Sequence, residues 1–124
     1  MNNNQNLKPV FDLEERTTEL AKRVIRLCRK LKKDSMNSRL VGQIVGSSGS
    51  VGANYREAND SLGKKDFILR LKISRRESKE TIHWLELVKE ANPEFINEVE
   101  GIIRETIEVK NILSAIIKKI ENKI

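Results

Sequence analysis

The sequence predicts an all-α protein, and three observations point to this fold class. Apolar residues recur at helical steps of three, four and seven, almost no segment alternates as a strand does, and turn residues gather in three places. The length of 124 residues fits one domain. We therefore predict four helices in a single domain over residues 11–124, preceded by an Asn-rich mobile tail in residues 1–10.

The first helix is predicted from Asp12 to about Lys33. The Asp12 carboxylate suits the cap of the first turn, and Glu15 follows three residues later, as in a capping box. The apolar positions of this segment form one stripe that we expect to face the core: Leu13, Leu20, Val24, Leu27, Cys28 and Leu31.

The second helix is predicted from near Ser38 to Ala58. It carries these apolar and small residues: Leu40, Ile44, Ser47, Val51, Ala53 and Tyr55. Four glycines also lie inside it: Gly42, Gly46, Gly49 and Gly52. Each costs about 1 kcal/mol relative to alanine in a helix interior, so we expect close helix packing to offset this cost. A phosphate-binding loop is not indicated, because no strand precedes the glycines and no Lys-Ser/Thr pair ends the run.

The third helix is predicted from about Lys64 to Ala91. Its inner face comprises Phe67, Leu71, Ser74, Ser78, Ile82, Leu85 and Val88. At ~1.5 Å per residue this helix is roughly 40 Å long, which exceeds the ~28 Å diameter of a compact ball of this size. The bundle is therefore expected to be elongated.

The fourth helix is predicted to begin at the Asn92-Pro93 boundary and to continue to about Lys119. Its two heptad positions hold Val99, Thr106, Leu113 and Ile120, and Phe95, Ile102, Val109 and Ile116. Five more isoleucines widen this seam or lie beside it: Ile96, Ile103, Ile107, Ile112 and Ile117. So much apolar surface exceeds the need of one bundle face, so we predict self-association into a homo-oligomer. The alternative is a central helix surrounded by the other three.

The net charge of +6 is unevenly distributed. Residues 1–79 carry 18 basic and 9 acidic side chains, whereas residues 80–124 carry 6 and 9. Seven of the basic residues fall between positions 22 and 33 with no acid among them, and like charges at this density favour a polyanionic partner. The candidate nucleic-acid contacts are Lys22, Arg23, Arg26, Arg29, Lys30 and Lys33. The alternative is a solvated face that pairs with acids of neighbouring helices.

Base recognition is not expected, because only 4% of the residues are aromatic and most of these have core spacing. A second basic group is interleaved with acids and indicates ordinary surface pairing: Arg70, Lys72, Arg75, Arg76 and Lys79.

Composition argues against an enzyme. One cysteine and one histidine cannot make a disulfide, a zinc site or a Ser-His-Asp arrangement, so we expect no metal and no cofactor. Cys28 and His83 are interpreted as packing or surface residues, and the hydroxyls of Ser47, Ser48 and Ser50 as donors to carbonyls one turn back. No apolar run is long enough to cross a bilayer and no secretory signal is present, so we expect a cytoplasmic protein.

Four polar residues of the second and third helices are candidates for a partly buried structural cluster: Asn54, Glu57, Glu77 and Glu80. If these helices are antiparallel, Glu77 and Glu80 can approach Arg56 or Asn54. Such a cluster fixes helix register more than it adds stability. The alternative is a catalytic carboxylate set.

The Gly/Ser-rich stretch that ends in Asn54-Tyr55-Arg56-Glu57, and the later Glu77-Ser78-Lys79-Glu80-Thr81 before Trp84-Leu85, resemble one family. It comprises the four-helix-bundle proteins encoded in intervening sequences of bacterial 23S rRNA genes. The matching positions are Ser50, Asn54, Glu57, Phe67, Glu77, Glu80 and Trp84, and the resemblance spans about residues 13–120. It implies a left-handed up-down-up-down bundle that assembles into a ring, most often a pentamer. The accessory protein of diversity-generating retroelements, a nucleic-acid-binding ring, is a related branch.

Two functions follow as hypotheses. The first is a non-enzymatic, ribosome- or rRNA-associated oligomer whose basic face binds structured RNA or other nucleic acid without reading its sequence. The second is a scaffold or adaptor ring that holds a protein partner and has no nucleic-acid role.

Overall fold

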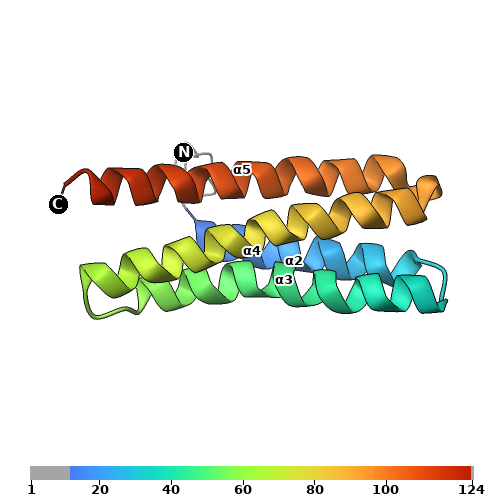
Figure 1. Cartoon of the computed structure of the whole chain (residues 1–124), viewed down its shortest axis with the longest axis horizontal. Helices are drawn as coiled ribbons and strands as arrows, with labels where there is room; N and C mark the ends of the chain where they lie inside the picture. Colours follow the sequence, from blue (N-terminus) through green and yellow to red (C-terminus); the bar gives the residue numbers. More distant parts are fainter. Residues whose placement is uncertain (1–11, 124) are drawn as a thin grey trace, which may run out of the picture.

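The protein, described by a computed structural model over residues 12–123, is an elongated helical bundle (Figure 1). Its elements in chain order are α2 (Leu13–Lys30), α3 (Ser35–Asn59), α4 (Lys64–Ala91), the short 3-10 helix η1 (Pro93–Phe95) and α5 (Ile96–Glu121). The four long helices run alternately in opposite directions, and the described residues contain no strand. The all-α fold is therefore confirmed, while the hand of the bundle stays a prediction. The proposed tail, residues 1–10, lies outside the described residues.

The end of the first helix and the start of the second differ from the sequence prediction, and both lie at the connection between α2 and α3. Asp12 caps α2 as predicted, because its carboxylate accepts a hydrogen bond from Glu15 N at 3.1 Å. The helix ends at Lys30, three residues early, because Leu31 is extended. The next helix begins at Ser35, because the Asp34 carboxylate accepts from Asn37 N at 2.8 Å and caps α3. Turns this short place consecutive helices side by side in opposite directions.

Each long helix packs on two others. The most extensive contact joins α3 to α4, α5 lies against α4 and α2, and α2 completes the bundle against α3. Within the described residues the diagonal pairs, α2 with α4 and α3 with α5, do not meet. The alternative that α5 is surrounded by all three other helices is therefore wrong. On α5 only Ile96 and Ile107 remain exposed among the large apolar side chains, at 42% and 37% of their surface.

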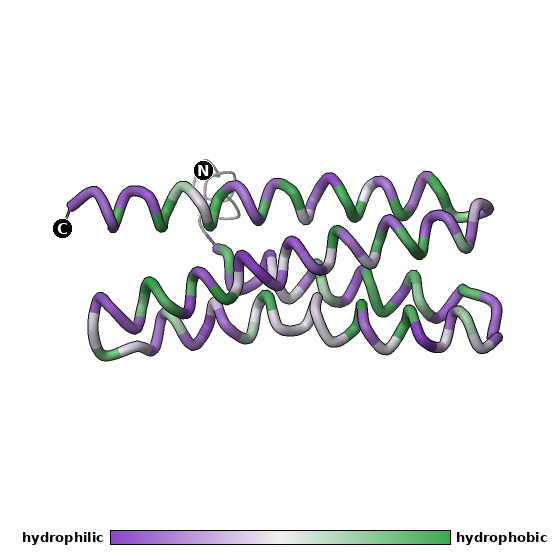
Figure 2. Tube along the Cα trace, in the orientation of Figure 1, coloured by the Kyte–Doolittle hydropathy of each residue, from purple (hydrophilic) through white to green (hydrophobic). Residues whose placement is uncertain are grey.

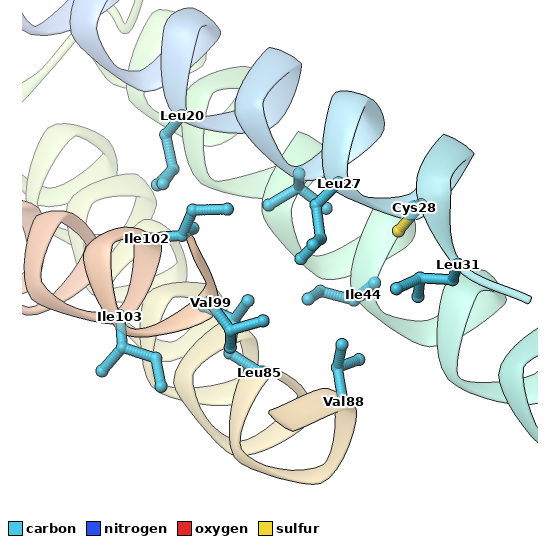
Figure 3. Close-up of a cluster of buried hydrophobic side chains, with 11 residues drawn as sticks. Leu20, Leu27, Cys28, Leu31, Ile44, Leu85, Val88, Val99, Ile102 and Ile103 are labelled. Carbon is cyan, nitrogen blue, oxygen red and sulfur yellow. The ribbon is translucent and has the colours of Figure 1, made fainter. Parts of the chain in front are cut away.

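The apolar core forms two clusters along the bundle. The cluster toward the α2–α3 turn, in which side chains of all four helices converge (Figure 3), comprises Leu20, Val24, Leu27, Cys28, Leu31, Ile44, Leu85, Val88, Val99, Ile102 and Ile103. The other comprises Leu13, Val51, Ala58, Leu71, Val109, Leu113 and Ile117. The whole stripe predicted for α2 is buried, and the apolar positions recur on the inner sides of the helices (Figure 2).

A layer of small hydroxyl residues separates the two clusters. Every long helix contributes to it: Thr17, Ser47, Ser48, Ser74, Ser78, Thr81 and Thr106. Ser74 Oγ donates to Val51 O at 2.7 Å, and Thr81 Oγ1 lies 2.9 Å from Ser47 Oγ, so two of these contacts join α3 to α4. Within residues 12–123 no buried side-chain polar atom lacks a partner. The small side chains bring α3 and α4 close together at no cost in unsatisfied groups.

The predicted close packing of glycines holds at one position only. A methyl group at Gly52 would lie 2.8 Å from Thr17 Oγ1, so α2 crosses α3 closely there. For Gly42, Gly46 and Gly49 the prediction is wrong within the chain, because nothing lies within 4 Å of the position that a methyl group would take. These three residues share the outer face of α3.

A buried amide pair joins two turns at one end of the bundle. Asn37 Nδ2 donates to Asn92 Oδ1 at 3.0 Å, and Asn92 Nδ2 donates to Asn37 Oδ1 at 2.9 Å. Each amide also donates to a backbone carbonyl, that of Lys32 for Asn37 and that of Val88 for Asn92. The pair therefore locks the α2–α3 turn onto the end of α4. Asn92 stands at the N-cap of η1 with Pro93 directly after it, as predicted, but its side chain makes no cap hydrogen bond there, and the same residue is the C-cap of α4.

Replacing Asn37 with alanine should lower the free energy of unfolding by about 2 kcal/mol, because it leaves buried oxygen atoms of Asn92 and Lys32 without donors. Urea denaturation followed by circular dichroism measures this change. Asn111→Ala, at an exposed position of α5, is the control and should change the free energy by less than about 0.5 kcal/mol. Equal effects of the two substitutions would contradict the assigned role.

Gly52→Ala should lower the free energy of unfolding by about 1 kcal/mol, because overlap with Thr17 outweighs the better helix propensity of alanine. Gly101→Ala is the matched comparison, since there the added methyl group meets only the ends of the flexible Arg23 and Arg104 side chains, and a gain in stability is expected. Thermal melts of both variants check the opposite signs.

Candidate nucleic-acid interface

Helix α2 presents a row of basic side chains to solvent. Lys22, Arg26 and Arg29 are exposed and separated by steps of four and three, which places them on one side of the helix. Lys33, predicted as the last helical residue, instead lies in the turn after α2, but its Nζ atom donates to Arg29 O at 3.5 Å. The four predicted residues therefore still form one row, which covers about 10 Å of helix from Lys22 to Arg29 at ~1.5 Å per residue and continues at Lys33 in the turn.

The other two predicted contacts, Arg23 and Lys30, lie on the side of α2 that faces α5. Lys30 Nζ donates to both carboxylate oxygens of Glu98, at 2.9 and 3.1 Å. Arg23 is half-buried, and its Nη2 atom would lie 3.3 Å from a methyl group at Gly101. For Lys30 the alternative of pairing with a neighbouring helix is therefore confirmed.

Arg16 begins this seam between α2 and α5, and the sequence analysis did not single it out. Its Nε and Nη2 atoms donate to the two carboxylate oxygens of Glu105 at 2.7 and 2.9 Å, and Nη2 also donates to Glu108 at 2.7 Å. These hydrogen bonds hold the pKa of the Arg16 guanidinium above its ordinary value. The signal in the sequence was a shared spacing of seven residues. The basic residues Arg16, Arg23 and Lys30 have this spacing in one helix, and the acidic residues Glu98 and Glu105 have it in the other.

Three side chains of the outer row keep their charge unmatched: Lys22, Arg29 and Lys33 have no carboxylate within 4.0 Å among residues 12–123. The same holds for the neighbouring exposed Lys32. Arg26 differs, because it donates to Glu19 at 2.9 Å and this hydrogen bond lowers the pKa of Glu19. Lys22, Arg29 and Lys33 are therefore the strongest part of the candidate interface.

The chemistry of this row suits phosphate groups better than bases. No Phe, Tyr or Trp lies in α2, so there is no platform on which a base could stack. A depression of about 500 Å³ adjoins Lys32 and Lys33, but Asp34 also lines it and its carboxylate already caps α3. Asp34 makes the depression a poor fit for a phosphate group, and the basic row itself lies on an open surface.

The second basic group shows the predicted surface pairing at three of its five residues. Lys72 pairs with Glu121 of α5 at 2.8 Å, Arg70 with Asp66 at 3.9 Å and Arg76 with Glu77 at 3.8 Å, whereas Arg75 and Lys79 have no carboxylate within 4.0 Å among residues 12–123.

No hydrogen bond within residues 12–123 joins the four residues of the predicted polar cluster to one another. The Asn54 amide donates to Ser50 O at 2.9 Å, in its own helix, and Glu57 and Glu80 are exposed. Arg56 donates to Glu14 of α2 at 3.0 Å rather than to Glu77 or Glu80. The buried polar groups are instead the hydroxyl layer and the Asn37–Asn92 pair.

The cysteine, the histidine and two of the serines, which are residue types often used in catalysis, make packing or local backbone contacts in this protein. Burial raises the pKa of the Cys28 thiol to about 11, so the thiol stays protonated near neutral pH. His83 is exposed and rests edge-on against Trp84. Ser47 and Ser48 donate to carbonyls one turn back, as predicted.

Residues 12–123 contain no group of three or more His, Cys, Asp or Glu side chains placed to hold a metal ion. Nor does any described helix combine the length and apolar character that crossing a membrane requires.

The comparisons with known proteins agree with this architecture. The family described as "23S rRNA-intervening sequence protein" matches residues 11–115. A crystal structure of a protein of unknown function from the S23 ribosomal protein family of Bacteroides thetaiotaomicron superposes with a TM-score of 0.75. It is 31% identical, and the alignment covers 85% of this chain and 97% of that one. The comparison with curated proteins gives no match.

Glu77→Gln should raise the free energy of unfolding at pH 7. Burial raises the pKa of Glu77 in the folded state and the charge of Glu80 adds to this effect, whereas Arg76 opposes it. The folded protein therefore binds this proton more tightly than the unfolded chain, and the native protein loses stability as pH rises through the two pKa values. The advantage of the variant should vanish below the ordinary glutamate pKa. Urea titrations at pH 7 and pH 3.5 test both statements, with exposed Glu90→Gln as the control.

Proposed function

Because the chain belongs to the 23S rRNA-intervening sequence protein family, we propose that it is a non-catalytic protein that binds structured RNA through the outer basic row of α2. The observation that carries this proposal is the set of exposed charges without acidic partners, Lys22, Arg29 and Lys33. Each phosphate that such a charge neutralises releases a counterion, which favours binding at low salt. The family description supports an association with ribosomal RNA.

Recognition in this proposal depends on the shape and charge of the RNA backbone. The row covers about 10 Å of helix and continues at Lys33, so it reaches a few phosphates of one strand, and double-helical segments hold those phosphates at fixed positions. With no aromatic side chain on α2, unpaired bases gain no stacking energy there. We therefore expect a preference for paired RNA over an unstructured strand, and no dependence on base sequence.

We further propose that copies of the chain assemble, as the family resemblance implies with a pentameric ring. One row offers few contacts, so a single copy binds RNA weakly. Several copies fixed in one particle present the row repeatedly, and their contacts add through effective concentration.

The triple variant Lys22→Gln, Arg29→Gln, Lys33→Gln should bind an RNA hairpin more weakly than the native chain. The slope of log K against log salt concentration should fall in magnitude by about 2 to 3, because three phosphate contacts are lost. Fluorescence anisotropy with a labelled hairpin, repeated over a series of salt concentrations, measures both quantities.

The matched control removes the same charge from the far end of α5, as Lys118→Gln, Lys119→Gln, Lys123→Gln. All three side chains are exposed. Near-native affinity of the control together with loss in the α2 variant would support the proposal. Equal losses in both variants would show that only net charge matters, and the basic row would then not be the RNA site.

A further inference from the structure

The outer face of α3 lacks charged residues over much of its length. No charged residue lies between Arg39 and Arg56, a run of sixteen residues that covers about 24 Å of helix, although 34% of the chain is charged. The middle of α3 is accordingly pale in the hydropathy colouring (Figure 2). Depletion of charge distinguishes the centre of a protein interface from ordinary surface.

Exposed apolar side chains border this uncharged face. Val45 of α3 and Ile25 of α2 are exposed at 38% and 42%. Thr17 lies opposite Gly52 and Glu14 opposite Arg56, so counting along the antiparallel pair places Ile25 level with Val45. Both helices therefore contribute apolar surface to one region.

The backbone of α3 is bare along the same face. Among residues 12–123, apart from the nearby backbone of α3 itself, nothing lies within 4 Å of the place that a side chain at Gly42, Gly46 or Gly49 would take, so these three helix-weakening residues gain nothing from such contacts. A second helix could approach such a surface more closely than the usual 8–10 Å between axes.

We propose that this face, formed by Gly42, Val45, Gly46, Gly49 and Ala53 with Ile25, is the surface on which a second copy of the chain docks. The inference rests on the self-association proposed above and assigns it to a surface. Two copies that each carry +6 repel one another over most of their surfaces. Contact through an uncharged face avoids placing like charges together at the centre of the interface.

The face extends from Gly42 to Ala53, about 17 Å along α3 at ~1.5 Å per residue.

The test compares Gly46→Arg with Ala115→Arg by light scattering on the full chain after nuclease treatment. Both substitutions add one arginine to an exposed helix position, and Gly46 has open space around it, so both variants should keep native helix content by circular dichroism. The native chain and Ala115→Arg should scatter as multiples of 14.3 kDa, whereas Gly46→Arg should fall to a single copy.

Gly46→Ala gives a second measurement that does not add charge. On a free surface it raises the melting temperature and leaves the particle mass unchanged, whereas in a close interface it weakens assembly at low protein concentration. Assembly that survives both Gly46 substitutions would overturn the docking surface while leaving self-association intact. A native chain that is a single copy at all concentrations would overturn both, and RNA binding by the α2 row would remain separately measurable.

Discussion

The structure depends on one packing constraint, the close approach of α3 and α4 through the layer of small hydroxyl residues. At this level both helices carry serine or threonine where a bundle commonly places leucine, and each hydroxyl must find an acceptor once water is excluded. Ser74 Oγ donates to Val51 O of α3, and Thr81 Oγ1 lies within hydrogen-bond distance of Ser47 Oγ of α3. These two contacts fix the register of the two helices. The resulting helical pair is the support on which α2 and α5 rest, and thus determines which side of α2 faces solvent.

Helix α2 is held by two different kinds of contact, and this explains the division of its basic residues. Its apolar stripe packs into the core, and Arg16 and Lys30 secure one flank to acids of α5. Arg16 is committed to the fold, since removing it leaves the half-buried Glu105 carboxylate without its partner, whereas the half-exposed Lys30–Glu98 pair contributes little. The charges on the opposite side serve no such purpose. They are the charges that the proposed RNA contact uses.

Much of the fold could be predicted from the sequence because helical periodicity records burial directly. The stripe of α2 is fully buried as predicted, and the heptad positions of α5 line the core as far as Leu113. The glycines of α3 could not be placed, because small residues occur on both its inner and outer sides and periodicity cannot then tell one from the other. The separation of Arg23 and Lys30 from the outer row depends on where α5 lies. The Asn37–Asn92 pair depends on two turns that are 55 residues apart meeting in space.

The amide pair also makes the two ends of the bundle unequal. At the end that holds Asn37 and Asn92, two connections are tied by buried hydrogen bonds that water cannot replace until the helices separate. At the other end, α4 and α5 are joined by the half-exposed Lys72–Glu121 pair, a type of contact that contributes at most about 1 kcal/mol. We therefore expect local opening of the native state to begin at the end of the bundle where α5 finishes. Backbone amides at the end that holds Asn37 and Asn92 should exchange with solvent only through rarer and larger fluctuations.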